Sequence, residues 1–212
     1  MTTDAQSRGT PAGLTSTWRA GGSPVGTAPR GFAEMIDALR TLQNRITAAA
    51  PPRDLVAEIT RTLTDLSTRL EPHTVDEHAQ ITGHLAELPG RGQAMAPVLH
   101  IDTADGDRAG GRVAFSRFYL GGSGAVHGGA IPLLFDEIMG RLANSGGRKP
   151  SRTAYLHVDY RSVTPVEAPL RVDAWFDHED GRKRLLKGAL YDGERLCAEA
   201  QGLFVELRPG QP

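Results

Sequence analysis

A glycine-rich stretch in the middle of the chain brings a histidine and two carboxylates close together in sequence. His127 is followed by Gly128 and Gly129. The apolar segment that comes next contains only two carboxylates, Asp136 and Glu137. Histidine and carboxylate side chains are the groups that most often exchange protons with a substrate. An ionised carboxylate among apolar side chains carries a large desolvation penalty, so its presence in such a segment indicates a function.

The segment that carries these carboxylates has the pattern of a buried helix. At about 100° per residue its apolar side chains form one stripe and extend around most of the circumference. The stripe consists of Ile131, Leu134, Phe135, Ile138 and Leu142. On a half-exposed helix Asp136 would be an ordinary solvated residue, and that alternative stays open. On a helix wrapped by other elements Asp136 would be a functional carboxylate, and Glu137 would point in a different direction.

The elements around this helix follow from a change in the apolar period. From residue 97 the apolar residues recur at every second position, which predicts strands. Six strands are expected, at 98–102, 112–120, 153–161, 170–178, 183–191 and 195–207. Asp-Gly pairs predict tight turns at 105–106, 180–181 and 192–193, and the glycine pair at 110–111 is interpreted as a further turn. The predicted fold class is therefore α+β, with one antiparallel sheet wrapped around one central helix.

The first part of the chain is predicted to extend this domain. Residues 1–30 are rich in Gly, Pro, Ser and Thr, and we expect them to be disordered. Residues 31–72 contain two helical repeats of apolar residues separated by two prolines, which predicts a helical hairpin that packs on the main domain or on a second subunit. Residues 73–95 are interpreted as a polar linker, and their three histidines lack metal-ligand spacing. The main domain is expected at residues 96–208.

Composition limits the classes of partner and compartment. The 212 residues carry a formal net charge of -1, so we expect neither nucleic acid nor an anionic membrane as a partner. There is no run of about 18 apolar residues that would predict a membrane span, and the first residues lack the apolar core of a signal peptide. The single cysteine, Cys197, cannot form an internal disulfide and is expected to be a small strand residue. A cytoplasmic protein is therefore expected.

The order of elements and the motif around the helix resemble a known family. The order ββαββββ, a His-Gly-Gly that opens the helix and an Asp nine residues after the His are similar to the hotdog-fold thioesterases of the phenylacetate-degradation (PaaI-like) superfamily. The segment 153–165, TAYLHVDYRSVTP, resembles the acyl-CoA thioesterase branch of the human thioesterase superfamily member type, which has a His, Asp and Thr active site. That branch places a Thr seven residues before a Tyr and a Pro five residues after it. The resemblance covers about residues 96–208.

This resemblance implies a catalytic set of four residues. Asp136 would act as general base or as nucleophile on the thioester carbonyl. The backbone N–H of Gly128 would stabilise the oxyanion at the helix N-terminus. His127 would orient this loop or assist by hydrogen bonding, and Thr153 would position the attacking water. Without the resemblance, His127 is equally well explained as a loop brace and Thr153 as an ordinary strand residue.

The resemblance also implies residues that bind the substrate. Gly129 belongs to the same loop, and Glu137 is the second carboxylate of the helix, for which a swapped catalytic role is the alternative. Arg152 and Arg161 would hold the phosphates of CoA by charge-assisted hydrogen bonds, although solvated arginines at strand ends are the more frequent case. The chain departs from the family pattern at Gly121, six residues before His127. Many relatives have an Asn at this position, and the hydrogen bond from that side chain is absent here.

The function implied is that of an acyl-CoA thioesterase, which hydrolyses a thioester to a free acid and CoA without a metal or an organic cofactor. The family further implies a homodimer or a dimer of dimers with the sites at the interface. The alternative is a non-catalytic hotdog module that binds acyl-CoA or an acyl carrier. A hotdog dehydratase is less favoured, because those enzymes space Asp and His differently on the helix. The acyl group, the role of the hairpin and the choice between base and nucleophile are left open.

Overall fold

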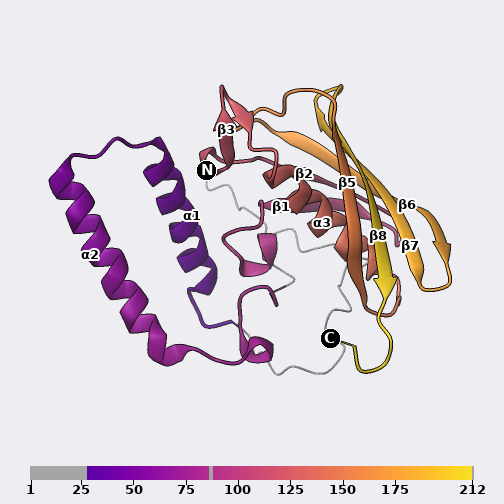
Figure 1. The fold of residues 1–212 in the computed structure, drawn as a ribbon, viewed down its shortest axis with the longest axis horizontal. Helices are drawn as coiled ribbons and strands as arrows, with labels where there is room; N and C mark the ends of the chain where they lie inside the picture. The colour runs from indigo at the N-terminus through magenta and orange to yellow at the C-terminus, as the bar shows by residue number, and fades with distance from the viewer. Residues whose placement is uncertain (1–27, 86–87, 212) are drawn as a thin grey trace, which may run out of the picture.

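One helix, α3 (Ala130–Ala143), lies against the face of a curved antiparallel sheet (Figure 1). The computed structural model describes residues 28–85 and 88–211. The sheet has the strand order β1-β2-β6-β7-β8-β5, and all neighbouring strands are antiparallel. Its strands are β1 (Leu99–Ala104), β2 (Arg108–Val113), β5 (Ser151–Tyr160), β6 (Leu170–Asp180), β7 (Lys183–Asp192) and β8 (Arg195–Glu206). The predicted α+β class, a sheet wrapped around one central helix, is confirmed.

The helix can approach the sheet closely because glycines lie under it. A Cβ on Gly188 of β7 would lie 2.9 Å from Met139 Cε, and a Cβ on Gly202 of β8 would lie 3.1 Å from the sulfur of the same methionine. The predicted apolar stripe of α3 faces this surface, and all of its members are buried. The core includes that stripe together with Phe115, Leu170, Val172, Leu186, Leu190, Cys197 and Phe204. Helix and sheet therefore share one core, which sets the position of α3.

The predicted strand at 112–120 is wrong, because the chain leaves the sheet after Val113. A 3-10 turn (Arg117–Tyr119) follows, and then a small two-stranded sheet of β3 (Leu120–Gly122) and β4 (Ala125–Val126). The predicted turn at 110–111 is also wrong, since both glycines lie within β2. There a Cβ on Gly111 would collide with the carbonyl oxygen of the facing strand β1, so glycine permits the close pairing of the two strands.

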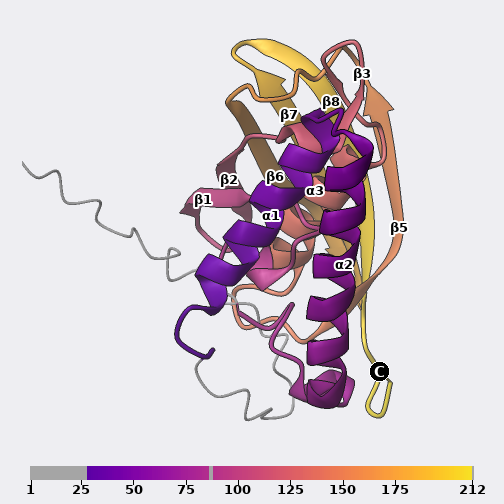
Figure 2. The ribbon, with the colours of Figure 1, turned by 90° about the vertical axis from the view of Figure 1, so that its left-hand side faces the viewer.

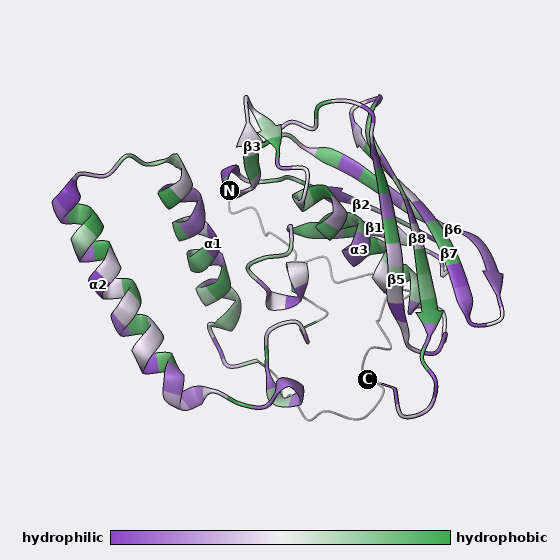
Figure 3. Ribbon diagram, in the orientation of Figure 1, coloured by the Kyte–Doolittle hydropathy of each residue, from purple (hydrophilic) through white to green (hydrophobic). Residues whose placement is uncertain are grey.

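Two helices at the start of the described chain form the predicted hairpin. They are α1 (Phe32–Ala48) and α2 (Arg53–Leu70), and the expected pair of prolines lies between them. Ile36 of α1 is buried, and Asn44 Oδ1 accepts a hydrogen bond from the Phe118 N–H at 3.0 Å, so α1 is attached to the main domain. In contrast, α2 lies on the outer side of α1 and has no buried residue (Figures 1 and 2). Hydrophobic and hydrophilic segments alternate along the ribbon of α2 (Figure 3). The exposed large apolar residues of this helix are Leu55, Val56, Leu63, Leu66 and Leu70.

The segment between the hairpin and the sheet is built from three short 3-10 turns. They lie at Glu71–His73, Glu77–Ala79 and Pro89–Gly92. Arg40 of α1 donates a hydrogen bond to the Gln93 carbonyl oxygen at 2.6 Å, which ties the end of this segment to the hairpin. The predicted disordered segment, residues 1–30, lies almost wholly outside the described residues. In the ranges that are described, each helix is too short or too polar to cross a membrane.

Candidate functional site

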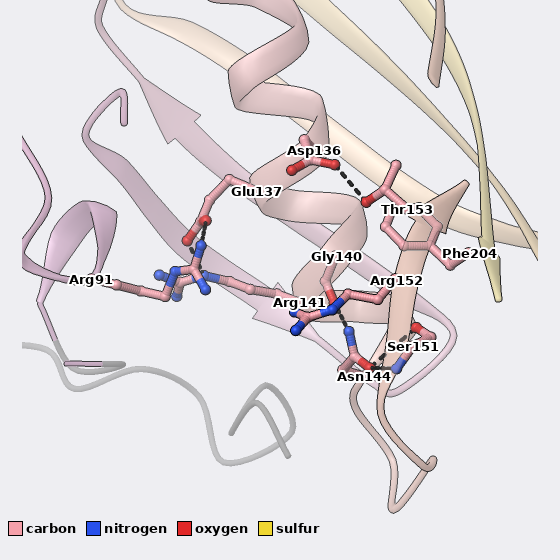
Figure 4. Close-up of a pocket in the computed structure, with 10 residues that line it drawn as sticks. All are labelled: Arg91, Asp136, Glu137, Gly140, Arg141, Asn144, Ser151, Arg152, Thr153 and Phe204. Atoms are coloured by element: carbon pink, nitrogen blue, oxygen red, sulfur yellow. Dashed lines mark hydrogen bonds and ion pairs between the residues drawn. The ribbon is translucent and has the colours of Figure 1, made fainter. Parts of the chain in front are cut away.

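Asp136 and Thr153 meet where α3 passes the edge strand β5 of the sheet. Thr153 lies on β5, and its hydroxyl donates a hydrogen bond to Asp136 Oδ1 at 2.8 Å (Figure 4). Both side chains are exposed, in contrast to the buried carboxylate expected on a wrapped helix. The reason is that the sheet ends at β5, so the strip of α3 beside this edge strand is only partly covered: Asp136 is exposed, and Leu133 and Gly140 are half-buried. A carboxylate and a hydroxyl thus lie side by side at the surface, where a bound ligand could contact both.

The loop before α3 is held by its own histidine and by a tyrosine from β5. His127 Nδ1 accepts a hydrogen bond from the Gly129 N–H at 3.0 Å, so the neutral ring carries its proton on Nε2. The hydroxyl of Tyr160 donates to the carbonyl oxygen of Gly128 at 2.7 Å. Within the described part of the chain, the exposed N–H of Gly128 donates to no acceptor. The loop therefore offers an open backbone donor next to the start of α3.

Glu137 points away from Asp136 into the protein, as the helical geometry requires. Its carboxylate is 6% exposed and binds two arginines, Arg91 Nη2 at 2.8 Å and Arg141 Nε at 2.7 Å. Arg141 is one helical turn further along α3, whereas Arg91 comes from the 3-10 turn at Pro89–Gly92. Sequence analysis did not find Arg91. Its only signal was the run Gly-Arg-Gly at 90–92, which is typical of a turn.

The two arginines expected to bind CoA have different environments. Arg161 donates to Glu199 Oε2 at 2.8 Å and to Asp159 Oδ2 at 3.2 Å. The hydrogen bond to Glu199 and the charge of Asp159 raise the pKa of Arg161 above its ordinary value, and the group stays charged. Arg152 instead lines the same pocket as Asp136. Arg152 thus lies at the candidate site. Arg161 is paired with carboxylates that lie outside this pocket. Their binding roles stay predictions.

A pocket of about 320 Å³ adjoins the pair formed by Asp136 and Thr153 (Figure 4). Its walls come from α3, β5, β8 and the turn at Pro89–Gly92. They consist of Arg91, Asp136, Glu137, Gly140, Arg141, Asn144, Ser151, Arg152, Thr153 and Phe204. The pocket is therefore polar and rich in arginine, and it opens beside a carboxylate that can accept a proton.

Comparison with known proteins gives matches to thioesterases. Residues 123–198, which include α3 and the preceding loop, match the family model described as thioesterase superfamily. The acyl-coenzyme A thioesterase THEM4 of Mus musculus is 33% identical over 91 residues, which are 42% of this chain and 39% of that protein. THEM4 of Rattus norvegicus gives the same identity and coverage. The chain thus spans about two fifths of the length of these relatives.

One solved structure covers nearly the whole chain. A crystal structure described as a thioesterase superfamily protein is 25% identical, with a TM-score of 0.71. The match covers 85% of this chain and 96% of that chain, so it includes more than the sheet and α3. This likeness and the matched family bear out the resemblance inferred from the His-Gly-Gly motif and the spaced aspartate.

Proposed function

We propose that this protein hydrolyses acyl-CoA thioesters to a free acid and CoA, because its sheet and α3 have the hotdog architecture and residues 123–198 match the thioesterase superfamily. The observation that carries the proposal is the hydrogen bond between Thr153 and Asp136 beside a pocket. A carboxylate with one oxygen held by a hydroxyl keeps its second oxygen for a water molecule. The activity of the THEM4 relatives, to which the chain is similar over part of its length, agrees with this chemistry.

In the proposed reaction Asp136 takes a proton from water as the water oxygen attacks the thioester carbonyl carbon. The carbonyl oxygen becomes an oxyanion, and the N–H of Gly128 donates a hydrogen bond to it. The tetrahedral intermediate then collapses, the carbon–sulfur bond breaks, and the thiolate of CoA takes up the proton from Asp136. Water supplies the oxygen and both protons, so the proposed reaction needs no metal and no organic cofactor. Direct attack by the Asp136 carboxylate, followed by hydrolysis of the anhydride, is the alternative route.

In this proposal Thr153 and His127 act as positioning residues. The Thr153 hydroxyl donates to Asp136 Oδ1 and so orients the carboxylate toward the water. His127 accepts from the N–H of Gly129 and so holds the loop, in which the neighbouring N–H of Gly128 would be the oxyanion donor. Gly129 thus contributes through the loop conformation. Glu137 is engaged by two arginines, which favours Asp136 over Glu137 as the reacting carboxylate.

We also propose that the protein works as a homodimer or a dimer of dimers. β5 is a ten-residue edge strand, and unpaired edges readily pair with another chain. Tyr155 of β5 is 46% exposed and Asp136 lies next to this edge, so a second copy would shield the site from water. The exposed apolar residues of α2 are a further surface for contact between copies. Light scattering should give a multiple of the 22.7 kDa chain mass, and a mass of one chain would contradict this proposal.

The test of the proposed function is thiol release over a panel of acyl-CoA thioesters. We expect turnover by the wild-type chain and a loss of at least about a hundredfold in Asp136→Asn, because the base is removed while the shape is kept. Asp65→Asn, an exposed aspartate of α2, is the matched control and should turn over normally. Undiminished turnover in Asp136→Asn would rule out the mechanism. Binding of acyl-CoA without turnover would instead favour the non-catalytic module.

A further inference from the structure

Two guanidinium groups share one buried carboxylate in the wall of the pocket beside Asp136. Glu137 accepts from Arg91 with one oxygen and from Arg141 with the other. Arg141 is 7% exposed, so its charge lies almost completely outside water. One negative charge thus faces two positive charges in a poorly hydrated place, and buried charges need close compensation.

Two nitrogens of these arginines have no acceptor among the residues that the structure describes. Arg141 Nη2 and Arg91 Nε are buried and make no hydrogen bond to any residue in the ranges 28–85 and 88–211. In contrast, Asn144 and Ser151 in the same wall are paired, since Asn144 Oδ1 accepts from the N–H of Ser151 at 2.7 Å and from its hydroxyl at 3.1 Å. Because buried donors are normally paired, the two arginines have donor capacity and one positive charge that Glu137 alone does not match.

The backbone that presents Arg91 adopts an uncommon conformation. Arg91 has φ 53°, in the left-handed region that non-glycine residues seldom adopt, and it follows Gly90 at φ 62°. The conformation is held by hydrogen bonds from the Arg91 N–H to the Leu88 carbonyl oxygen at 2.8 Å and from the Gly83 N–H to the Arg91 carbonyl oxygen at 2.9 Å. Strained residues of this kind are typical of ligand sites, because the surrounding structure must maintain them.

We propose that these arginines bind a carboxylate at the far end of a short acyl group, so that the preferred substrates are CoA thioesters of dicarboxylic acids. This inference rests on the proposed function, since it places the thioester carbonyl at Asp136. Both guanidinium groups bind Glu137, the residue next to Asp136 on α3, and all four residues line the same pocket. The two ends of a short dicarboxylic acyl group would thus meet Asp136 and the arginines within one pocket. The Arg91 side chain, 28% exposed, would make the outer contact, while Arg141 holds Glu137.

The phosphates of CoA are the other source of negative charge, and the pocket argues against them. Its volume of about 320 Å³ and its position between α3 and β5 suit a short acyl group rather than a nucleotide. Thr153 and Asp136 lie in the same wall, so the pocket is continuous with the place of reaction. An arginine that binds phosphate would act on every CoA thioester equally, whereas one that binds an acyl carboxylate discriminates between acyl groups.

The experiment compares glutaryl-CoA with pentanoyl-CoA, which have acyl groups of the same carbon number and differ in the terminal carboxylate. We expect kcat/KM for glutaryl-CoA to exceed that for pentanoyl-CoA by about tenfold or more. Arg91→Met should reduce this ratio toward one, and Arg91→Lys should keep part of it because the charge remains. Arg195→Met, which removes an exposed arginine of the turn between β7 and β8, is the matched control and should keep the wild-type ratio.

Each possible result supports or overturns the inference. The same preference with glutaryl-pantetheine over pentanoyl-pantetheine, which lack the nucleotide phosphates, supports an acyl-carboxylate site. Hydrolysis of pentanoyl-CoA without preference for glutaryl-CoA, or an equal loss for both in Arg91→Met, overturns it and leaves the proposed function intact. If neither thioester is hydrolysed while another acyl-CoA of the panel is, the inference is overturned and the proposed function stands. If no acyl-CoA of the panel is hydrolysed, the proposed function fails. In that last case, the dissociation constants of glutaryl-CoA and pentanoyl-CoA are compared by calorimetry on the wild-type chain. Tighter binding of glutaryl-CoA supports the carboxylate site, and equal binding overturns it.

Discussion

Replacing Thr153 with valine removes one hydroxyl while keeping nearly the same volume and the strand preference of the residue. The lost interaction is the 2.8 Å hydrogen bond to Asp136 Oδ1, whose acceptor is a carboxylate. A hydrogen bond to a charged group contributes about 1.5–3 kcal/mol. Since both side chains are exposed in the chain, the lower end of that range applies. A loss of about 1.5 kcal/mol of transition-state stabilisation corresponds to a decrease of roughly tenfold in kcat/KM.

The assay is thiol release from the best acyl-CoA of the panel, measured for Thr153→Val and for Thr153→Ser. Serine keeps the hydroxyl, so Thr153→Ser should retain most of the activity. Thr103→Val, at an exposed position of β1, is a matched control that should not change kcat/KM. Wild-type activity in Thr153→Val would refute the positioning role. Equal losses in the valine and serine variants would show that the methyl group and packing matter rather than the hydrogen bond.

Three further predictions concern stability and use chemical denaturation as the measurement. Glu137→Gln should lower the free energy of unfolding by about 3 kcal/mol, because two arginines lose their shared carboxylate, while the exposed Glu58→Gln should have no effect. Gly188→Ala should cost about 1–3 kcal/mol, since the added Cβ would lie 2.9 Å from Met139 Cε and 3.0 Å from a backbone oxygen of β6. An unchanged denaturation midpoint would contradict the buried ion pairs in the case of Glu137→Gln, and the close contact between α3 and the sheet in the case of Gly188→Ala. The Asp105 carboxylate accepts hydrogen bonds from two backbone N–H groups, and these lower its pKa. The stability that this carboxylate adds to the folded state is therefore present at neutral pH and is lost as the pH falls through the lowered pKa. Asp105→Asn should make the free energy of unfolding less sensitive to acid.

Local patterns in the sequence were sufficient for most of the fold. The period of the apolar residues identified α3 and five of the six strands of the main sheet, all except β2, because alternation and helical repeats depend on near neighbours along the chain. Asp-Gly pairs located the turns between β6 and β7 and between β7 and β8 for the same reason. The pattern was misleading at 112–120, where Val113 and Phe115 are both buried although only Val113 belongs to a strand. Side chains can be buried at alternate positions even where the backbone forms no hydrogen bonds with a neighbouring strand.

The candidate site was only partly determined by the sequence. The resemblance indicated Asp136, Thr153 and the loop at His127, and the structure brings Asp136 and Thr153 within hydrogen-bonding distance. Tertiary structure alone decided that Asp136 is exposed on a partly covered strip of α3, and that Glu137 is buried against Arg91 from a segment interpreted as a linker. The exposure of a helical side chain and the partner of a buried charge depend on which distant segments cover the helix. Which segments cover the helix is decided by packing across the whole domain. The periodicity of the sequence indicates only the type of element to which a residue belongs.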